Sequence, residues 1–269
     1  IGFDAVMTMA INLELNQSIK LKENLSDDSH DKRWGDHNAQ FIDLLNRFYV
    51  DAKFHDFYVN HQSFYDKVAA NFEETLKELD VQWLEKFFGQ APNGSTNLIL
   101  SVSNGRNCYG PKTIYKSGQK DIYAIMGVEK TDSLGVPIYT NRLIPFIIHE
   151  LCHSYCNPII DSHYNEMEST ASKIHSLVST KMEEQHYGSP QTMLKEMLVR
   201  ACVIKYNQYK KASEAKIQGM IVNEKNHGFL WIEELVNSLS TYADNRVKYA
   251  SLNDFFPEVV KLQNGTSLE

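Results

Sequence analysis

The pattern H-E-x-x-H at residues 149–153 limits what this chain can fold into more than any other segment. Residues i and i+4 lie on one face of an α-helix, so His149 and His153 would point the same way from a helix. The apolar residues 146–148 come directly before the pattern and predict that the other face of this helix is buried. Polar side chains on such a helix need partners, because burying them alone is costly.

Two histidines with this spacing can bind one zinc ion (Zn²⁺) through their imidazole nitrogens. Glu150 follows His149 directly, so it can reach a water bound to the ion and act as general base. The alternative is a half-buried helix on which the two histidines are merely hydrogen-bonded. The apolar setting favours zinc, because two histidines and a glutamate on the polar side of a core helix require an explanation.

A catalytic zinc site usually has three protein ligands, so a third is expected outside the pattern. The metzincin continuation is excluded, because Cys156 stands where that pattern has glycine and Ile159 where it has its third histidine. The remaining possibility of this kind is an acid from a later helix.

Three acids compete for that position. Glu196 is favoured because the helix expected at residues 191–211 is apolar around it, and an acid there needs a partner. Arg200 follows four residues later and is expected to orient the Glu196 carboxylate, although a plain salt bridge between the two would look the same. The rivals lie in a polar segment, where a glutamate is most simply solvated; they are Glu166 and Glu168, with His163 as a further candidate.

The whole chain predicts an α+β fold that is predominantly α-helical, with a small β-sheet preceding the H-E-x-x-H helix. The first ninety residues indicate helices, and the pattern changes to strands after a turn at residues 91–95. Asn157-Pro158 is expected to end the H-E-x-x-H helix at residue 156. Strands are predicted at residues 97–103, 113–115 and 121–127. Helices are predicted at residues 39–49, 64–79, 141–156, 163–185, 191–211 and 255–262, with another that follows residues 228–232 and ends near residue 242.

Together the H-E-x-x-H helix, the Glu-x-x-x-Arg-Ala segment at residues 196–201 and the upstream sheet resemble a gluzincin-type zinc metallopeptidase. More narrowly, the chain resembles an uncharacterised bacterial family of unknown function with a peptidase assignment and mostly exported members. The narrower resemblance rests on residues 57–65, 104–111, 148–158, 196–201, 228–232 and 242–256.

The resemblance covers most of the chain, and only its zinc motif specifies a mechanism. It implies a zincin-like catalytic core, with His149, His153 and Glu196 as zinc ligands and Glu150 as base. We expect a single peptidase-like unit over residues 1–269, in which residues 1–92 form a helical N-terminal part and residues 93–269 hold the zincin-like core with the active-site helices.

The expected function is hydrolysis of peptide bonds in a peptide or protein substrate by a zinc-bound water. Glu150 is the candidate general base. His227 is the candidate donor that stabilises the oxyanion, and Tyr109 is the alternative donor. The strand at residues 121–127 is expected to pair with an extended substrate by strand addition.

Two other functions remain open. A non-catalytic module that binds peptide or glycan would use zinc to stabilise its fold, and a fourth protein ligand such as Cys156 or His163 would close its site. A zinc hydrolase of non-peptide amides would apply the same residues to another substrate. The number of protein ligands on the zinc ion distinguishes the non-catalytic module from a peptidase. Substrate profiling distinguishes the hydrolase of non-peptide amides from a peptidase.

Composition argues against two classes of partner. The net charge is −7, and the chain has no basic run beyond Lys210-Lys211, so no nucleic acid is expected as a partner. No apolar stretch is long enough for a transmembrane segment. Four cysteines do not make a disulfide framework in 269 residues, and Cys152 and Cys156 are expected to fill a helix core. Because the chain begins at Ile1, we expect its native N-terminus upstream, in an exported protein that is secreted, periplasmic or lipid-anchored.

Overall fold

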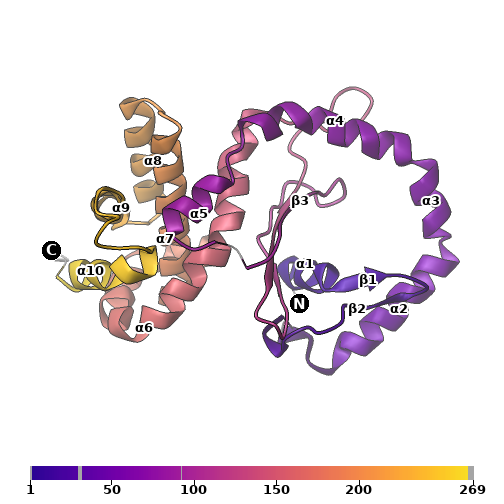
Figure 1. Ribbon diagram of the computed structural model, residues 1–269, viewed down its shortest axis with the longest axis horizontal. Coiled ribbons are helices and arrows are strands. Elements are labelled where there is room, and N and C mark those ends of the chain that lie inside the picture. Colours follow the sequence, from indigo (N-terminus) through magenta and orange to yellow (C-terminus); the bar gives the residue numbers. More distant parts are fainter. Residues whose placement is uncertain (1, 30–31, 92, 266–269) are drawn as a thin grey trace. The chain divides into compact units, whose positions relative to one another are not determined.

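The computed structural model describes residues 2–29, 32–91 and 93–265, and most of these are helical (Figure 1). The described residues also form one sheet of two strands and one of three. The fold is therefore α+β and predominantly α-helical, which confirms the expected fold class. In the part of the chain described, no helix combines the length and the apolar character needed to cross a membrane.

The described residues form two compact units. The first comprises residues 2–79 and 93–150, and the second comprises residues 80–91 and 151–265. The short helix α5 (Gln82–Phe88) belongs to the second unit because its aromatic rings pack there. The Trp83 ring lies 5.2 Å from the Tyr206 ring, and the Tyr242 hydroxyl donates to the Phe87 carbonyl at 2.6 Å. The boundaries of these two units therefore differ from the division between residues 92 and 93 that we expected from the sequence.

The first unit contains a three-stranded sheet with β5 (Lys120–Met126) at its centre. β3 (Thr96–Leu100) pairs with β5 in parallel, and β4 (Lys112–Ile114) pairs with it antiparallel. Beyond β4, Tyr109 and Ile125 exchange backbone hydrogen bonds of 2.8 and 3.0 Å. All three predicted strands are therefore present. Because β5 is already paired on both sides, the expectation that this strand pairs with a substrate is wrong.

Helices and a small hairpin make up the rest of the first unit. The helices predicted at residues 39–49 and 64–79 are present as α2 (Asn38–Asp51) and α4 (Gln62–Glu78). The hairpin was not predicted, because strands of three residues are too short for alternation to stand out. The other elements are α1 (Phe3–Ile11), β1 (Leu13–Leu15), β2 (Ile19–Leu21), α3 (Phe54–Asn60) and the 3₁₀ turns Asp27–Ser29, Lys32–His37 and Asn141–Leu143.

The H-E-x-x-H pattern lies on α6 (Ile144–Glu184), a single helix of 41 residues. The expected end at residue 156 and the separate helix at residues 163–185 are therefore wrong. Pro158 lies inside the helix and costs about 3 kcal/mol, because it lacks an N–H and its ring crowds the preceding turn. Apolar side chains on both sides of it are buried at about 1.5–3 kcal/mol each, which outweighs that cost. They include Leu151, Ile159, Ile160 and Met167.

The second unit is built around α7 (Pro190–Tyr209), whose residues are buried along most of its length. α9 (Ile232–Asp244) and α8 (Glu214–Asn226) pack on α7, and α10 (Leu252–Asn264) packs on α9. α8 was not predicted, although the Ser213 side chain caps its start. α7, α9 and α10 correspond to predicted helices. This packing fixes α7 within the second unit, and with it the buried side chains of that helix.

Candidate metal centre

α6 places His149 and His153 one turn apart on the same side of the helix. Both are half-buried, whereas Ile148 and Leu151 on its other side are buried. The apolar side chains hold this part of α6 in the core, so the side that carries the histidines is the partly open one. This is the arrangement that the sequence pattern predicts.

α7 supplies a carboxylate. Pro190 begins this helix, and the Ser189 hydroxyl caps it by accepting a hydrogen bond of 3.1 Å from the Thr192 backbone N–H. Glu196 is the one acid in the α7 sequence, and it is buried among apolar neighbours such as Met193 and Met197. Its Oε1 lies 3.3 Å from Nε2 of His153. The buried acid thus faces an imidazole of the motif helix.

His149, His153 and Glu196 each offer one ligand atom, and these atoms lie within 4.8 Å of one another. Two ligands of a tetrahedral zinc ion, each about 2.0–2.2 Å from the metal, are about 3.3 Å apart. The separation between His153 and Glu196 has this size. Two imidazole nitrogens and one carboxylate oxygen are also a donor set that zinc accepts. The three residues therefore fit a zinc ion.

The rival ligands lie elsewhere. Glu166 and Glu168 are exposed, and Glu166 Oε1 lies 3.4 Å from Nδ1 of His163 without hydrogen-bond geometry. The Cys156 thiol is buried, 3.8 Å from Sγ of Cys202. Within residues 2–29, 32–91 and 93–265, none of the rivals joins the group of His149, His153 and Glu196. The described group thus offers three ligand atoms, whereas a closed structural site has four protein ligands.

Arg200 lies behind Glu196 on α7. Its Nε is 3.8 Å from Glu196 Oε2, which makes an ion pair rather than a hydrogen bond, and its Nη1 donates to Glu224 Oε2 at 2.7 Å. The guanidinium also stacks 4.6 Å from the centre of the Phe229 ring. Burial alone would lower the pKa of Arg200, but Glu224, Tyr187 and Glu196 outweigh it and raise the pKa. This fixed cation lies on the side of Glu196 that is opposite to the oxygen facing His153, and it helps to orient the carboxylate.

Tyr187 is a further neighbour of Glu196 that the sequence did not reveal. Nη2 of Arg200 donates to its hydroxyl oxygen at 3.3 Å. Burial and the charge of Glu196 raise the pKa of Tyr187, and a hydrogen bond to the Glu196 side chain adds to this shift. Tyr187 lies between α6 and α7, where no periodicity or motif marks it. The sequence held one indirect signal of such a neighbour. Arg200 is a cation on an apolar helix, and a cation there requires polar neighbours.

Glu150 lies next to His149 on α6 and is half-buried. The loop at residues 104–111 runs against this point, because a Cβ atom on Gly110 would overlap the backbone carbonyl of Glu150. Only glycine allows this close approach. Burial raises the pKa of the neighbouring Tyr109 hydroxyl, and the charges of Asp4, Cys108 and Glu150 add to the shift. The Tyr109 hydroxyl therefore keeps its proton, and its ring packs against the buried cluster of Ile11, Tyr123 and Ile125.

His227 is the C-terminal cap residue of α8, and its side chain is largely exposed. Its Nδ1 lies 3.6 Å from Oε2 of Glu224, the same oxygen that Arg200 binds. His227 therefore does not belong to the group of ligand atoms around His153. It contacts that group only through the chain of charges formed by Glu224, Arg200 and Glu196.

Three thiols fill the core between α6 and α7. Cys152, Cys156 and Cys202 are free and fully buried, which is the core-filling role expected for the first two. Burial raises the pKa of Cys152 and of Cys156, so both are neutral thiols. They pack as small apolar side chains against α7, where Cys156 Sγ lies 3.8 Å from Cys202 Sγ.

Comparison with known proteins gives a family but no function. No curated protein and no solved structure matches the chain. One family profile, described as a domain of unknown function (DUF4932), matches residues 2–262. This match includes α6, α7 and all three residues of the candidate metal centre. The chain belongs to the DUF4932 family.

Proposed function

We propose that this protein is a zinc-dependent metallopeptidase of the gluzincin type with a zincin-like core. His149, His153 and Glu196 are its zinc ligands, and Glu150 is its general base. The observation that carries the proposal is the convergence of a buried glutamate from α7 on two histidines one turn apart on α6. A plain ion pair would need only one histidine, whereas three convergent donors meet the usual requirement of a catalytic zinc site.

When bound, zinc would polarise the scissile carbonyl and lower the pKa of a water at the site. Glu150 follows His149 on α6, so its carboxylate is placed to take a proton from the attacking water. It then passes that proton to the amine nitrogen as the C–N bond breaks. Glu150 therefore acts as base in the first step and as acid in the second.

Arg200 and Tyr187 support this chemistry from behind the ligand set. Arg200 places a positive charge 3.8 Å from Glu196 Oε2, and the Tyr187 hydroxyl accepts a hydrogen bond from Arg200. A ligand held by such neighbours is both more basic toward the metal and better oriented. Glu224 in turn fixes Arg200, so the carboxylate is positioned by a connected set of charges.

For the developing oxyanion, Tyr109 has more support as donor than His227. The Tyr109 loop approaches the backbone at Glu150, and the raised pKa of its hydroxyl keeps the proton that a donor needs. The His227 ring instead lies beside Glu224. If Tyr109 is the donor, Tyr109→Phe lowers kcat by about 100-fold with little change in KM, whereas His227→Gln leaves kcat near the wild-type value.

The proposed substrate is a peptide or protein, and we propose that the enzyme acts outside the cytoplasm, in keeping with the exported family that its sequence resembles. A decisive test combines zinc analysis by mass spectrometry with cleavage of a library of internally quenched peptides. We expect Glu150→Gln to keep one zinc per chain and to lose about 10²–10⁴-fold in kcat/KM. Glu183→Gln, an exposed glutamate near the end of the same helix, is the matched control and keeps full activity.

Full activity in the Glu150→Gln variant would contradict the proposed mechanism. A wild-type protein that binds zinc but cleaves no peptide in the library would instead favour a non-catalytic module. Cleavage restricted to small non-peptide amides would identify the other hydrolase.

A further inference from the structure

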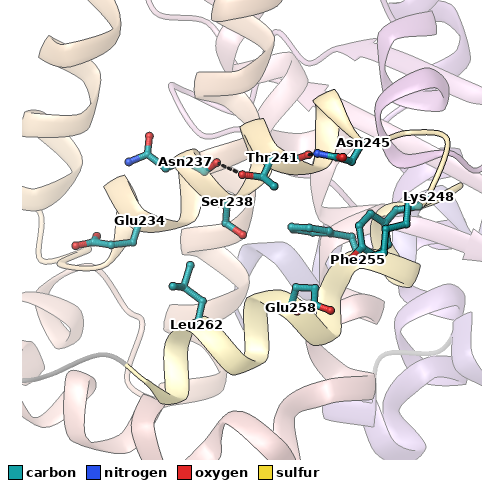
Figure 2. A pocket seen from close by; sticks show the side chains of 10 residues that line it. Glu234, Asn237, Ser238, Thr241, Asn245, Lys248, Phe255, Glu258 and Leu262 are labelled. Carbon is teal, nitrogen blue, oxygen red and sulfur yellow. Dashed lines mark hydrogen bonds between the residues drawn. The ribbon is translucent and has the colours of Figure 1, made fainter.

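A groove of about 620 Å³ lies between α9 and α10 in the second unit (Figure 2). The two helices run in opposite directions and are joined by residues 245–251. Each turns apolar side chains into the core, among them Leu239 of α9 and Val259 of α10. Most of the groove is therefore lined by the polar outer faces of the two helices. None of its lining residues belongs to the candidate metal centre.

A row of polar side chains follows the α9 side of this groove. Asn237, Thr241 and Asn245 recur every four residues and are all exposed. Thr241 Oγ1 donates to the Asn237 backbone carbonyl at 3.4 Å, and Asn245 Nδ2 donates to the Thr241 carbonyl at 2.8 Å. These bonds do not use the carboxamide of Asn237 or Oδ1 of Asn245. The row therefore offers both donors and acceptors to a ligand.

The spacing of this row matches one kind of ligand. Four residues of an α-helix rise about 6 Å. Two residues of an extended chain rise about 6.6 Å, which is the repeat at which its peptide groups face the same way. A carboxamide can donate to a backbone carbonyl and accept from a backbone N–H. The row can thus hydrogen-bond alternate peptide groups of one extended segment, in whatever direction the segment runs.

The charges of the groove favour a basic ligand over an acidic one. Glu234 and Glu258 line it together with one cation, Lys248. The Lys248 ammonium lies 4.6 Å from the centre of the Tyr249 ring at the end of the groove near Asn245, whereas Glu234 lies near the other end (Figure 2). Glu258 is already paired with Lys261 at 3.3 Å, so the acidic end of the groove is the one at Glu234, and a lysine or arginine side chain would be attracted there.

An oligosaccharide fits this groove less well. Sugar rings usually stack on an open aromatic face, but Phe255 is buried and its ring contacts Tyr249 edge-on at 4.9 Å. The Lys248 ammonium covers the Tyr249 ring in turn. The groove thus has a row of hydrogen-bonding groups without an open aromatic platform.

We propose that the groove between α9 and α10 binds an extended polypeptide segment that carries basic side chains. From Glu234 to Asn245 the helix is about 16 Å long, which corresponds to about five extended residues. Such a segment would place its backbone along Asn237, Thr241 and Asn245 and a basic side chain beside Glu234. This recognition is non-covalent and needs no metal, so it does not depend on the proposed peptidase activity.

The test is fluorescence anisotropy with a fluorescein-labelled peptide in which threonine and lysine alternate over six residues. We expect saturable binding with a Kd of about 10–100 μM, as for other short extended peptides. The double variant Asn237→Leu/Thr241→Val weakens binding at least about tenfold, because two hydrogen-bonding groups are lost. Asn253→Leu is the matched control, since it changes an exposed asparagine of α10 outside the groove.

Two further arms keep the test independent of how a variant folds. On the wild-type protein, a peptide with proline in place of threonine lacks half of the backbone N–H donors and binds at least about tenfold more weakly. Glu234→Gln weakens binding of the lysine peptide but not of its uncharged serine analogue. Equal binding by the proline peptide, no saturation at about 1 mM, or displacement of the peptide by chitotriose would overturn the proposal.

Discussion

Two histidines of α6, ten residues apart, each lie beside a glutamate, with nearly the same separation between the ring nitrogen and the carboxylate oxygen. His153 lies 3.3 Å from Glu196, and His163 lies 3.4 Å from Glu166. The histidines are buried to a similar degree, but the acids differ: the Glu196 side chain is 10% exposed and the Glu166 side chain 65%. Glu196 comes from a second helix, whereas Glu166 is three residues from its histidine.

The difference shows that distance alone does not mark a metal site. An exposed acid three residues away is held by water as readily as by its histidine, so such a pair contributes little. The charge of a buried acid from another helix must be compensated by its neighbours. Glu196 lies close to a second histidine, His149, and to the cation of Arg200. The His153–Glu196 pair therefore differs from the His163–Glu166 pair in two ways: His149 adds a third metal-binding atom, and the cation of Arg200 lies beside the acid.

The largest expected effect tests this comparison directly. Glu196→Gln should weaken zinc binding by at least about 100-fold, because losing a ligand costs more than losing its outer neighbours. Glu166→Gln, the matched change in the other pair, should leave zinc affinity unchanged. Competition with a chromophoric zinc chelator measures both. Equal zinc affinity in the two variants would show that Glu196 is not a ligand.

A smaller effect is expected from the cation behind Glu196. Arg200→Met should lower zinc affinity by about 10–100-fold and destabilise the metal-free protein by about 3 kcal/mol, because Glu224 and Glu196 lose their buried counter-charge. Arg200→Lys should recover part of the zinc affinity. Chelator competition and urea unfolding measure the two quantities, with the exposed Arg142→Met as control. Lost stability with unchanged zinc affinity would make Arg200 a purely structural residue.

The smallest effect concerns one hydroxyl. Tyr187→Phe removes a hydrogen bond of about 0.5–1.5 kcal/mol, so zinc affinity should fall by about 2- to 10-fold. Tyr164→Phe, at another half-buried tyrosine of the same unit, should have no effect. Titration calorimetry of the metal-free proteins resolves such a difference. A loss as large as that of Glu196→Gln would mean that Tyr187 binds the metal itself.

The sequence predicts the parts of this site that depend on local spacing or local polarity. The four-residue interval between His149 and His153 places them on one helix face, and the apolar neighbours of Glu196 single it out among the acids. Tyr187 and Glu224 could not be found in this way, because each reaches the site through tertiary packing that leaves no pattern in its own segment.

The fold shows the same limit. The three strands of the sheet around β5 and most helices follow from periodicity, but Pro158 led to a wrong prediction of where α6 ends. A proline is a local signal, and buried side chains on both sides of it overrode that signal. β5 likewise has a clear strand pattern, yet its central place in the sheet depends on partners that are distant in sequence.

The thiols between α6 and α7 allow local opening of this part of the core to be measured by chemical labelling. Cys152, Cys156 and Cys202 have no solvent exposure, so a thiol reagent reaches them only when the core between the two helices opens. Cys108, in the loop near Glu150, is only partly buried and should react first, which gives an internal reference rate. The slow phase of labelling then measures the free energy of local opening where α6 and α7 meet.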